Sequence, residues 1–387
     1  MITSVVASTC GRAIDAALRT AGNNCRIYPP SGFLLIPAPD VGVTAVLPRC
    51  FSALISPAWG PILPGNVSLG EDKSMSRPKA HHYVPRFYLN RFTNADGKLW
   101  VLDKPDWRIY PSTPKNAAFV NSFCELQWLK DIGDDSCLLE RQLGSVESAV
   151  APIIDSWLVQ RERGTQIPIS EQDRKLVSLF LAIQMLRTLE ARTLLLQFLE
   201  FITAGGTDAP PLPVTAQEQT QIHADIMWDA EIVNPVAREI HERIWIFGYN
   251  DSPTLFCTSD HPVLLKSGDN RGWVVDMQVI DTFLKKERDP SDYIVFPVSP
   301  HWVLYCYDRN HYPKMVRFDT HVSPVPFTSD MVNHENSGQI GMSTRFVYSS
   351  VNDFEFAREF AADQPWIRDP KRSRLESRSN PYARGED

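Results

Sequence analysis

The chain lacks the features that mark several specialised classes of protein. Its seven cysteines include no Cys-x-x-Cys pair and their number is odd, which argues against a disulfide scaffold and against a zinc finger. No apolar run reaches the roughly 18 residues that a membrane span needs, so no membrane partner is expected. A glycine-rich phosphate loop and a Gly-x-Ser-x-Gly turn are also missing, which removes two common catalytic frameworks.

Basic residues are in the minority, with 39 Lys and Arg against 46 Asp and Glu and a net charge of −7. Broad electrostatic capture of nucleic acid or anionic lipid is therefore not expected, although a local basic cleft is compatible with this charge. What is present is the composition of an ordinary globular chain. It has 387 residues, 43% apolar and 22% charged, which is enough for a substantial core.

Residues 1–74 differ in composition from the rest of the chain. They carry only five basic and four acidic residues, about half the charge density found elsewhere, and eight prolines interrupt their apolar runs. No helix or central strand of useful length is expected there. Three interpretations stay open: translated sequence upstream of a native start at Met75, a disordered extension, or a targeting segment. In each case we expect the segment to contribute little to the fold.

The remaining chain is expected to form one domain over residues 75–361 and a charged tail over residues 362–387. The tail has few apolar anchors, so it is expected to be disordered. The cysteines of the domain are expected to be reduced and at least partly buried, as in a cytoplasmic protein.

The pattern of residues 75–361 changes from helical periodicity to short strands near Ile244. Long helices are predicted over residues 134–163 and 170–204, and a third follows the proline-rich loop at 209–213 and kinks at Asn234–Pro235. Separate helical and strand blocks indicate an α+β fold, with three long helices packed against a largely antiparallel sheet of short strands. The strands are expected over residues 98–103, 244–249, 255–258, 263–266, 273–275, 293–298, 302–307 and 346–348, and two further helices over 329–341 and 353–361.

The second of these helices is apolar nearly all round, which predicts a buried central helix. Gln184, Arg187 and Glu190 lie three residues apart on it, roughly on one face. A buried guanidinium needs a carboxylate or an anionic ligand, so we expect Arg187 to pair with Glu190 or Glu140, or to bind an anion. Glu140 and Glu147, two turns apart, are interpreted as a solvated helix face rather than an acid pair.

Residues 81–92, His-His-Tyr-Val-Pro-Arg-Phe-Tyr-Leu-Asn-Arg-Phe, are the most unusual stretch. They concentrate titratable, metal-binding and anion-binding side chains. Together with residues 258–263 (Thr-Ser-Asp-His-Pro-Val) and 296–300 (Phe-Pro-Val-Ser-Pro), they make the chain resemble the domain of unknown function 4238 family over about residues 79–350. Members of that family start shortly before the His-His pair, which agrees with a start at Met75. The resemblance implies no established activity.

The first five residues of this stretch are also similar to the first motif of HNH-type (ββα-metal) nucleases. That resemblance implies that His81 ligates a divalent metal ion and that His82 is the general base that activates water. A neutral imidazole with a pKa of about 6.5 can accept a proton at pH 7, and the ion would stabilise charge on the phosphate. The nuclease motif also needs an Asn, which Asn116 or Asn121 could supply, and a final His. No histidine occurs between His82 and His223.

Asp260 lies at the expected tip of a strand, where functional residues often sit. We therefore expect His81, His82 and Asp260 to ligate one divalent metal ion, and His82, Arg86 and Arg187 to be the catalytic residues, with an arginine holding the phosphate. The structural alternative is a Ser-Asp turn capped by its own side chains, together with a histidine pair that bonds to backbone carbonyls.

Two functions from different classes follow from these residues. The first is a metal-assisted phosphodiesterase or nuclease, acting in bacterial defence or conflict, with a nucleic acid or another phosphodiester as substrate. The second is a non-catalytic module for ligand sensing or protein interaction, in which the His-His segment is structural.

Overall fold

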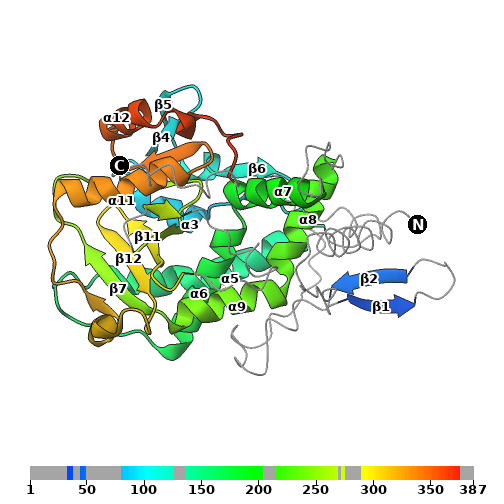
Figure 1. Ribbon diagram of the computed structural model, residues 1–387, viewed down its shortest axis with the longest axis horizontal. Coiled ribbons are helices and arrows are strands. Elements are labelled where there is room, and N and C mark those ends of the chain that lie inside the picture. The colour runs from blue at the N-terminus through cyan, green and yellow to red at the C-terminus, as the bar shows by residue number, and fades with distance from the viewer. Residues whose placement is uncertain are drawn as a thin grey trace, which may run out of the picture.

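The computed structural model describes most of the chain after residue 79 (Figure 1). Within residues 1–74 it describes only two strands, β1 (Phe33–Pro37) and β2 (Thr44–Pro48), which pair antiparallel. The three interpretations of that segment otherwise lie outside the described residues. The described ranges are 33–37, 44–48, 80–125, 136–203, 215–268, 272–274 and 289–374.

A six-stranded sheet forms the centre of the fold, in the order β10-β9-β11-β12-β7-β13. All neighbouring pairs are antiparallel except β13 with β7. The largely antiparallel sheet expected after residue 244 is therefore confirmed. Its strands are β7 (Ile244–Tyr249), β9 (Leu264–Lys266), β10 (Trp273–Val274), β11 (Tyr293–Ser299), β12 (Trp302–Tyr307) and β13 (His321–Val322).

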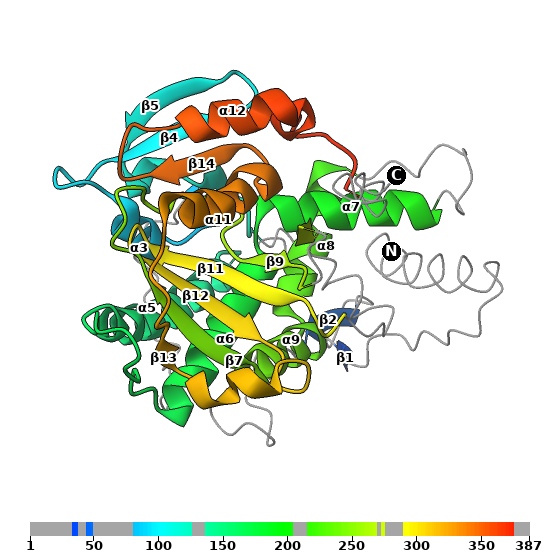
Figure 2. The same cartoon turned by 60° about the vertical axis from the view of Figure 1, so that its left-hand side comes forward.

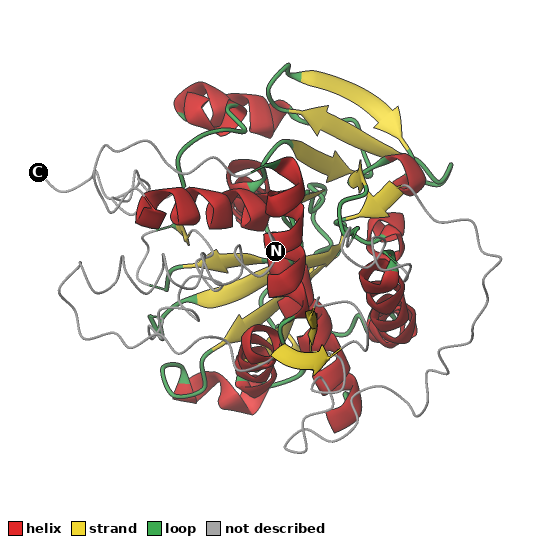
Figure 3. Ribbon diagram, turned by 90° about the vertical axis from the view of Figure 1, so that its right-hand side faces the viewer, coloured by secondary structure: helices red, strands yellow, loops and turns green. Residues whose placement is uncertain are grey.

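Different helices cover the two faces of this sheet (Figures 2 and 3). Ile294 and Phe296 join the main core with α5, α6 and α9, whereas Val295 between them packs with Val332 of α11 on the other face. Successive residues of a strand point to opposite faces, so β11 is buried on both sides. The bounds of these helices are α5 (Leu138–Trp157), α6 (Glu171–Leu186), α9 (Ala230–Glu242) and α11 (Ser329–Met342).

The long helix predicted over residues 170–204 is two helices, α6 and α7 (Leu189–Thr203). Ser170 caps α6 as expected, accepting a hydrogen bond from the Asp173 backbone N–H. The break falls at Arg187–Thr188, because the Thr188 hydroxyl accepts the Ala191 backbone N–H and so starts a new helix. The prediction of one helix was wrong here, although α6 is the buried central helix that was expected.

The third predicted helix is also two helices, α8 (Ala216–Trp228) and α9. Asp229 separates them: its backbone is extended, and its carbonyl accepts the first hydrogen bonds of α9. This break lies five residues before Asn234–Pro235, where a kink is expected, and Pro235 lies inside α9.

A second, four-stranded sheet packs beside the first, in the order β5-β4-β14-β8. Its described strands pair with one another and not with those of the six-stranded sheet. The chain passes from the second sheet to the first between β8, which ends at Ser259, and β9. α12 (Glu355–Asp363) packs on this sheet through Ala357 and Ala361. One sheet was expected, so this division corrects the prediction while the α+β class holds. The bounds are β4 (Leu99–Asp103), β5 (Arg108–Ser112), β8 (Thr258–Ser259) and β14 (Phe346–Ser349).

The beginning of the expected disordered tail is ordered. Ile367 is fully buried, and Arg374 donates to both carboxylate oxygens of Glu190 at 2.8 Å each. Arg372 lies against the same carboxylate. These contacts are long-range, which is why composition alone did not reveal them; the tail beyond residue 374 lies outside the described residues. Among the described helices, none combines the length and apolar character that crossing a bilayer requires.

Candidate metal centre

The His-His pair lies on a short strand, β3 (Ala80–His82), which pairs antiparallel with β6 (Phe119–Asn121). His81 is buried and His82 is half-buried, because neighbouring residues of a strand point to opposite sides. The two histidines therefore face different surroundings. This opposite orientation agrees with the expectation from the sequence.

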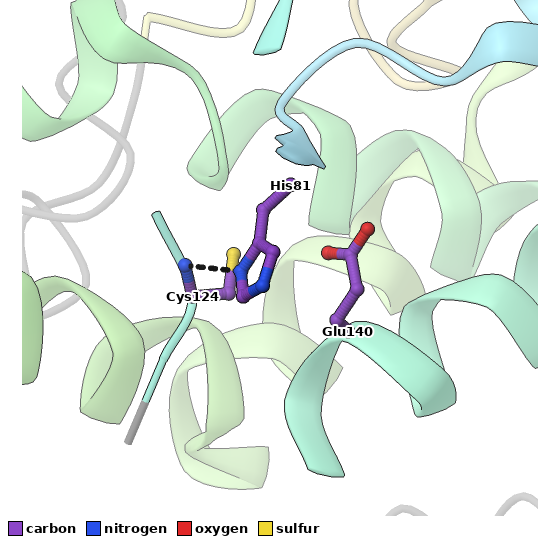
Figure 4. Close-up of side chains that lie close together, drawn as sticks. All are labelled: His81, Cys124 and Glu140. Carbon is purple, nitrogen blue, oxygen red and sulfur yellow. Dashed lines mark hydrogen bonds between the residues drawn. The ribbon is translucent and has the colours of Figure 1, made fainter. Parts of the chain in front are cut away.

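His81 meets two residues that the sequence did not single out as partners. Its ligand atom, the Cys124 sulfur and a Glu140 carboxylate oxygen all lie within 4.8 Å of one another (Figure 4). Ligands of one tetrahedral zinc ion, at about 2.0–2.3 Å from the metal, lie roughly 3.3–3.8 Å apart, so small rotations of these side chains would bring them to one ion. Among the described residues, this is the cluster of His, Cys, Asp and Glu side chains that could hold a metal ion.

The imidazole of His81 is fixed by the backbone of its neighbour. Nδ1 of His81 accepts a hydrogen bond from the Cys124 backbone N–H at 3.0 Å. In a neutral imidazole the other nitrogen, Nε2, then carries the proton. An ion can bind a neutral imidazole through Nε2 only if the proton moves to Nδ1, which then no longer accepts, and through Nδ1 only if it replaces the Cys124 N–H. Either way, metal binding breaks this hydrogen bond.

Glu140 reaches the cluster from the first turn of α5. Burial raises the pKa of its carboxyl to about 7, with a further rise from Glu147, while Arg187 and the His82 backbone N–H lower it. Its Oε2 atom is buried and has no hydrogen-bond partner among the described residues. The interpretation of Glu140 and Glu147 as a solvated face was therefore wrong for Glu140.

Cys124 is fully buried, and burial raises the pKa of its thiol to about 12. Such a thiol is inert as a free nucleophile at pH 7. It can become a metal ligand because a bound ion displaces the thiol proton. Cys124, Cys137, Cys257 and Cys306 are all buried and form no disulfide within the described part of the chain, as expected for reduced cysteines.

His82 is suited to accept a proton. Its Nε2 lies 3.2 Å from the Lys115 carbonyl oxygen, which can only accept, so Nε2–H donates and Nδ1 is left as an acceptor. Burial lowers the pKa of His82, and the charges of Arg86 and Arg187 lower it further. The imidazole is therefore neutral at pH 7.

Arg187 lies at the end of α6, beside the cluster. Its Nη1 donates to Glu147 Oε1 at 2.8 Å, and its Nε donates to the Tyr83 carbonyl at 3.2 Å. The side chain is only 2% exposed, yet Nη2 has no partner among the described residues. The expected buried ion pair exists, but its partner is Glu147 rather than Glu140 or Glu190. Glu190 pairs instead with Arg374.

Asp260 does not join the histidines in a cluster of ligand atoms within the described structure. Its carboxylate accepts three backbone N–H groups, from Thr344 (2.8 Å), Arg345 (2.7 Å) and Phe346 (2.8 Å). These bonds hold the start of β14. Of the three ligands predicted from the sequence, only His81 therefore lies in this cluster, together with Cys124 and Glu140.

Arg86 begins a short helix, α3 (Arg86–Leu89), and is exposed. It lies near enough to His82 to lower the pKa of that imidazole. Of the predicted catalytic residues, Arg187 acts on the pKa values of Cys124 and Glu140, and His82 reaches Glu140 through its backbone N–H, while its ring lies on the other side of β3 from His81. Arg86 is exposed. The final histidine of an HNH-type motif has no counterpart in the cluster. The cluster offers one His, one Cys and one Glu as possible ligands.

Comparison with known proteins gives a family and no activity. No curated protein and no solved structure matches the chain. A family described as Protein of unknown function (DUF4238) matches residues 80–353, which include the His-His strand, Cys124, Glu140, Arg187 and Asp260. Since this match spans well over half of the sequence, the chain belongs to the DUF4238 family.

Proposed function

We propose that this protein is a metal-dependent hydrolase of phosphodiesters, with one divalent ion held by His81, Cys124 and Glu140. The observation that carries the proposal is the convergence of these three side chains from β3, the segment after β6, and α5. Three protein ligands leave a fourth position open for water, as in catalytic zinc sites. The ion would lower the pKa of that water and polarise the phosphate.

The neighbouring residues supply the other groups that hydrolysis needs. His82 is neutral, and its Nδ1 is free of the Lys115 contact, so we propose it as the general base; its ring leaves β3 on the side opposite to His81 and has to turn towards the bound water. Arg187 has an N–H group, that of Nη2, with no partner among the described residues, and it could donate to a phosphate oxygen. Water would lose its proton to His82 as its oxygen attacks phosphorus, and the alkoxide leaving group would take up a proton from solvent.

The local charge favours a phosphodiester over a phosphomonoester. A divalent ion would balance the Cys124 thiolate and the Glu140 carboxylate, and Glu147 balances Arg187, while the charge of the exposed Arg86 is screened by solvent. Arg192, whose charge acts on the Cys124 thiol, adds one positive charge. A diester carries one negative charge at pH 7 and a monoester close to two. A role in defence or conflict stays a prediction from the sequence.

The non-catalytic alternative also has an observation in its favour. His81 is 1% exposed and bonds to a backbone N–H, and β3 is paired along its length with β6. In that interpretation the pair closes the fold and binds no ion. Substitution of His81 would then cost stability and change nothing else.

The test is hydrolysis of bis(p-nitrophenyl) phosphate and of single- and double-stranded oligonucleotides by the full chain with zinc, manganese or magnesium. The proposal predicts that His82→Ala lowers kcat by roughly 100-fold or more with a small change in thermal midpoint. His321→Ala is the matched control, since His321 is also half-buried and bonded to a carbonyl, that of Asp319. Equal loss of activity in both variants, or no activity with any metal ion, would contradict the proposal.

A further inference from the structure

We propose that Arg192, anchored by His223, is a positioning residue that holds the Phe123–Cys124 segment so that the Cys124 sulfur meets His81. This inference rests on the proposed metal site, whose ligands do not include either residue. Cys124 is the third residue after β6, following Ser122 and Phe123. Because no strand or helix contains this segment, contacts with other parts of the chain must hold it in place.

Arg192 makes two contacts to Phe123, the residue before the ligand. Its Nη2 donates to the Phe123 carbonyl at 2.8 Å, and its guanidinium carbon lies 3.6 Å from the centre of the Phe123 ring. The carbonyl of Phe123 belongs to the same peptide unit as the Cys124 N–H that bonds to His81. Arg192 and His81 therefore hold opposite ends of one planar peptide group, which fixes the position of the Cys124 Cα atom from which the side chain leaves the backbone.

His223 of α8 holds the guanidinium in place. Nδ1 of His223 accepts from Nε of Arg192 at 3.1 Å, and Nε2 of His223 donates to the Leu186 carbonyl at 2.7 Å. The ring of His223 also packs edge-on against Phe123, with centroids 5.4 Å apart. His223 is 1% exposed, so it spans from the end of α6 to Arg192 without competition from water.

The backbone around this segment has a conformation that needs such support. Ala118 and Ser122, on either side of β6, have φ values of +51° and +56°. Residues with a side chain rarely adopt this left-handed region, and they keep it only where surrounding contacts hold it. The contacts of Arg192 with Phe123 supply that restraint next to Ser122.

The test is titration of the full chain with cobalt(II), whose near-ultraviolet thiolate charge-transfer absorption reports sulfur ligation, and whose visible bands report coordination geometry. Wild type should show both. Arg192→Met should bind cobalt at least 10-fold more weakly and lose most of the thiolate band. The matched control is Arg174→Met: Arg174 also lies over an aromatic ring, that of Trp245, and donates to backbone carbonyls, but outside this site. It should lower the thermal midpoint and leave the cobalt spectrum unchanged.

Two substitutions of His223 separate positioning from general support. An Asn side chain can place an oxygen where Nδ1 lies and so keep the bond from Arg192, whereas a Gln side chain can place an amide where Nε2 lies and keep only the bond to Leu186. We expect His223→Asn to retain the thiolate band and His223→Gln to lose it. These comparisons hold even if Arg192→Met fails to fold.

The outcomes separate this inference from the hydrolase proposal. If wild type binds cobalt with a thiolate band, and Arg192→Met and His223→Gln lose that band, the positioning role is supported even if no phosphodiester is hydrolysed. A folded Arg192→Met with the wild-type cobalt spectrum and affinity would overturn it, as would greater loss in His223→Asn than in His223→Gln. Absence of a thiolate band in wild type would overturn both the positioning role and the metal site.

Discussion

Nδ1 of His81 accepts the backbone N–H of Cys124 at 3.0 Å, across 43 residues of sequence. This one contact joins the first strand of the domain to the segment after β6 and sets the protonation of the imidazole. It also makes the resting geometry of the site incompatible with a metal ion at the same nitrogen. Metal binding through either ring nitrogen therefore has to change the hydrogen bonding of His81.

That change gives a spectroscopic prediction. In the metal-free protein, nitrogen-15 chemical shifts should assign the proton of His81 to Nε2, because Nδ1 is the acceptor. Zinc at Nε2 should move that proton to Nδ1, and zinc at Nδ1 should shift the Nδ1 resonance; in both cases the resonance of the Cys124 amide should move, because its hydrogen bond is lost. His223, which donates through Nε2 to Leu186, is the internal reference and should not change. An unchanged His81 spectrum at saturating zinc would show that the ion does not bind here.

Asp260 should behave as a structural residue. Asp260→Asn keeps the shape of the side chain but replaces one of its two acceptor oxygens with an NH2 donor, so it cannot accept all three backbone N–H groups. We expect the free energy of unfolding to fall by about 1–3 kcal/mol in urea denaturation, the cost of a buried unsatisfied group. Asp96→Asn, at an exposed position, should cost almost nothing. Zinc affinity should be the same as in wild type, and a marked loss would return Asp260 to the ligand set.

The buried His261 should make the folded protein less stable at acidic pH. Burial lowers its pKa to about 4, and the nearby Arg372 and Arg374 lower it while Glu190 raises it. Its Nδ1 lies 2.8 Å from the Thr188 hydroxyl. Because the unfolded chain takes up a proton near pH 6.5 and the folded chain does not, stability is full above pH 6.5 and falls as the pH drops from 6.5 to 4.

Each unit of pH in that window should cost up to about 1.4 kcal/mol for this group. Urea denaturation at several pH values measures the slope, and His261→Gln should reduce it. A slope equal to that of wild type would show that His261 is not the group that titrates.

Several elements were predictable because their signal is local. The strands over residues 244–249 and 302–307 were predicted with the bounds that the structure shows, since turn residues flank each β-rich run. The Ser170 cap was also readable from its sequence. By contrast, the break at Arg187–Thr188 depends on a hydroxyl that bonds to His261, 73 residues away, in a stretch whose own propensity is helical.

The candidate site was only partly predictable, for a related reason. The adjacent histidines His81 and His82 are visible in the sequence, and the apolar helix around Arg187 predicts a buried guanidinium that needs a carboxylate partner. Glu140 looked like a surface residue because its burial depends on β3 packing against α5, and Cys124 carries no motif at all. Asp260 looked like a ligand because the N–H groups that satisfy it come from 84–86 residues later in the chain.

Deleting residues 1–74 tests the domain boundary. A chain that starts at Met75 should have a thermal midpoint within about 2 °C of the full chain, a smaller shift than roughly 1 kcal/mol would cause at this size. The reason is the low charge density and the eight prolines of that segment. Differential scanning calorimetry measures the midpoint, and loss of soluble expression in the shorter chain would contradict the prediction.

The measurement that tests the central claim most directly is the number of zinc ions bound per chain, determined by mass spectrometry of metals after zinc saturation and desalting. The account predicts one ion in wild type and in the control Cys257→Ser, whose buried cysteine lies outside the cluster. It predicts loss of that ion in His81→Ala, Cys124→Ser and Glu140→Gln, each folded by circular dichroism. No bound zinc in the folded wild type, or one ion retained in all three variants, would contradict it.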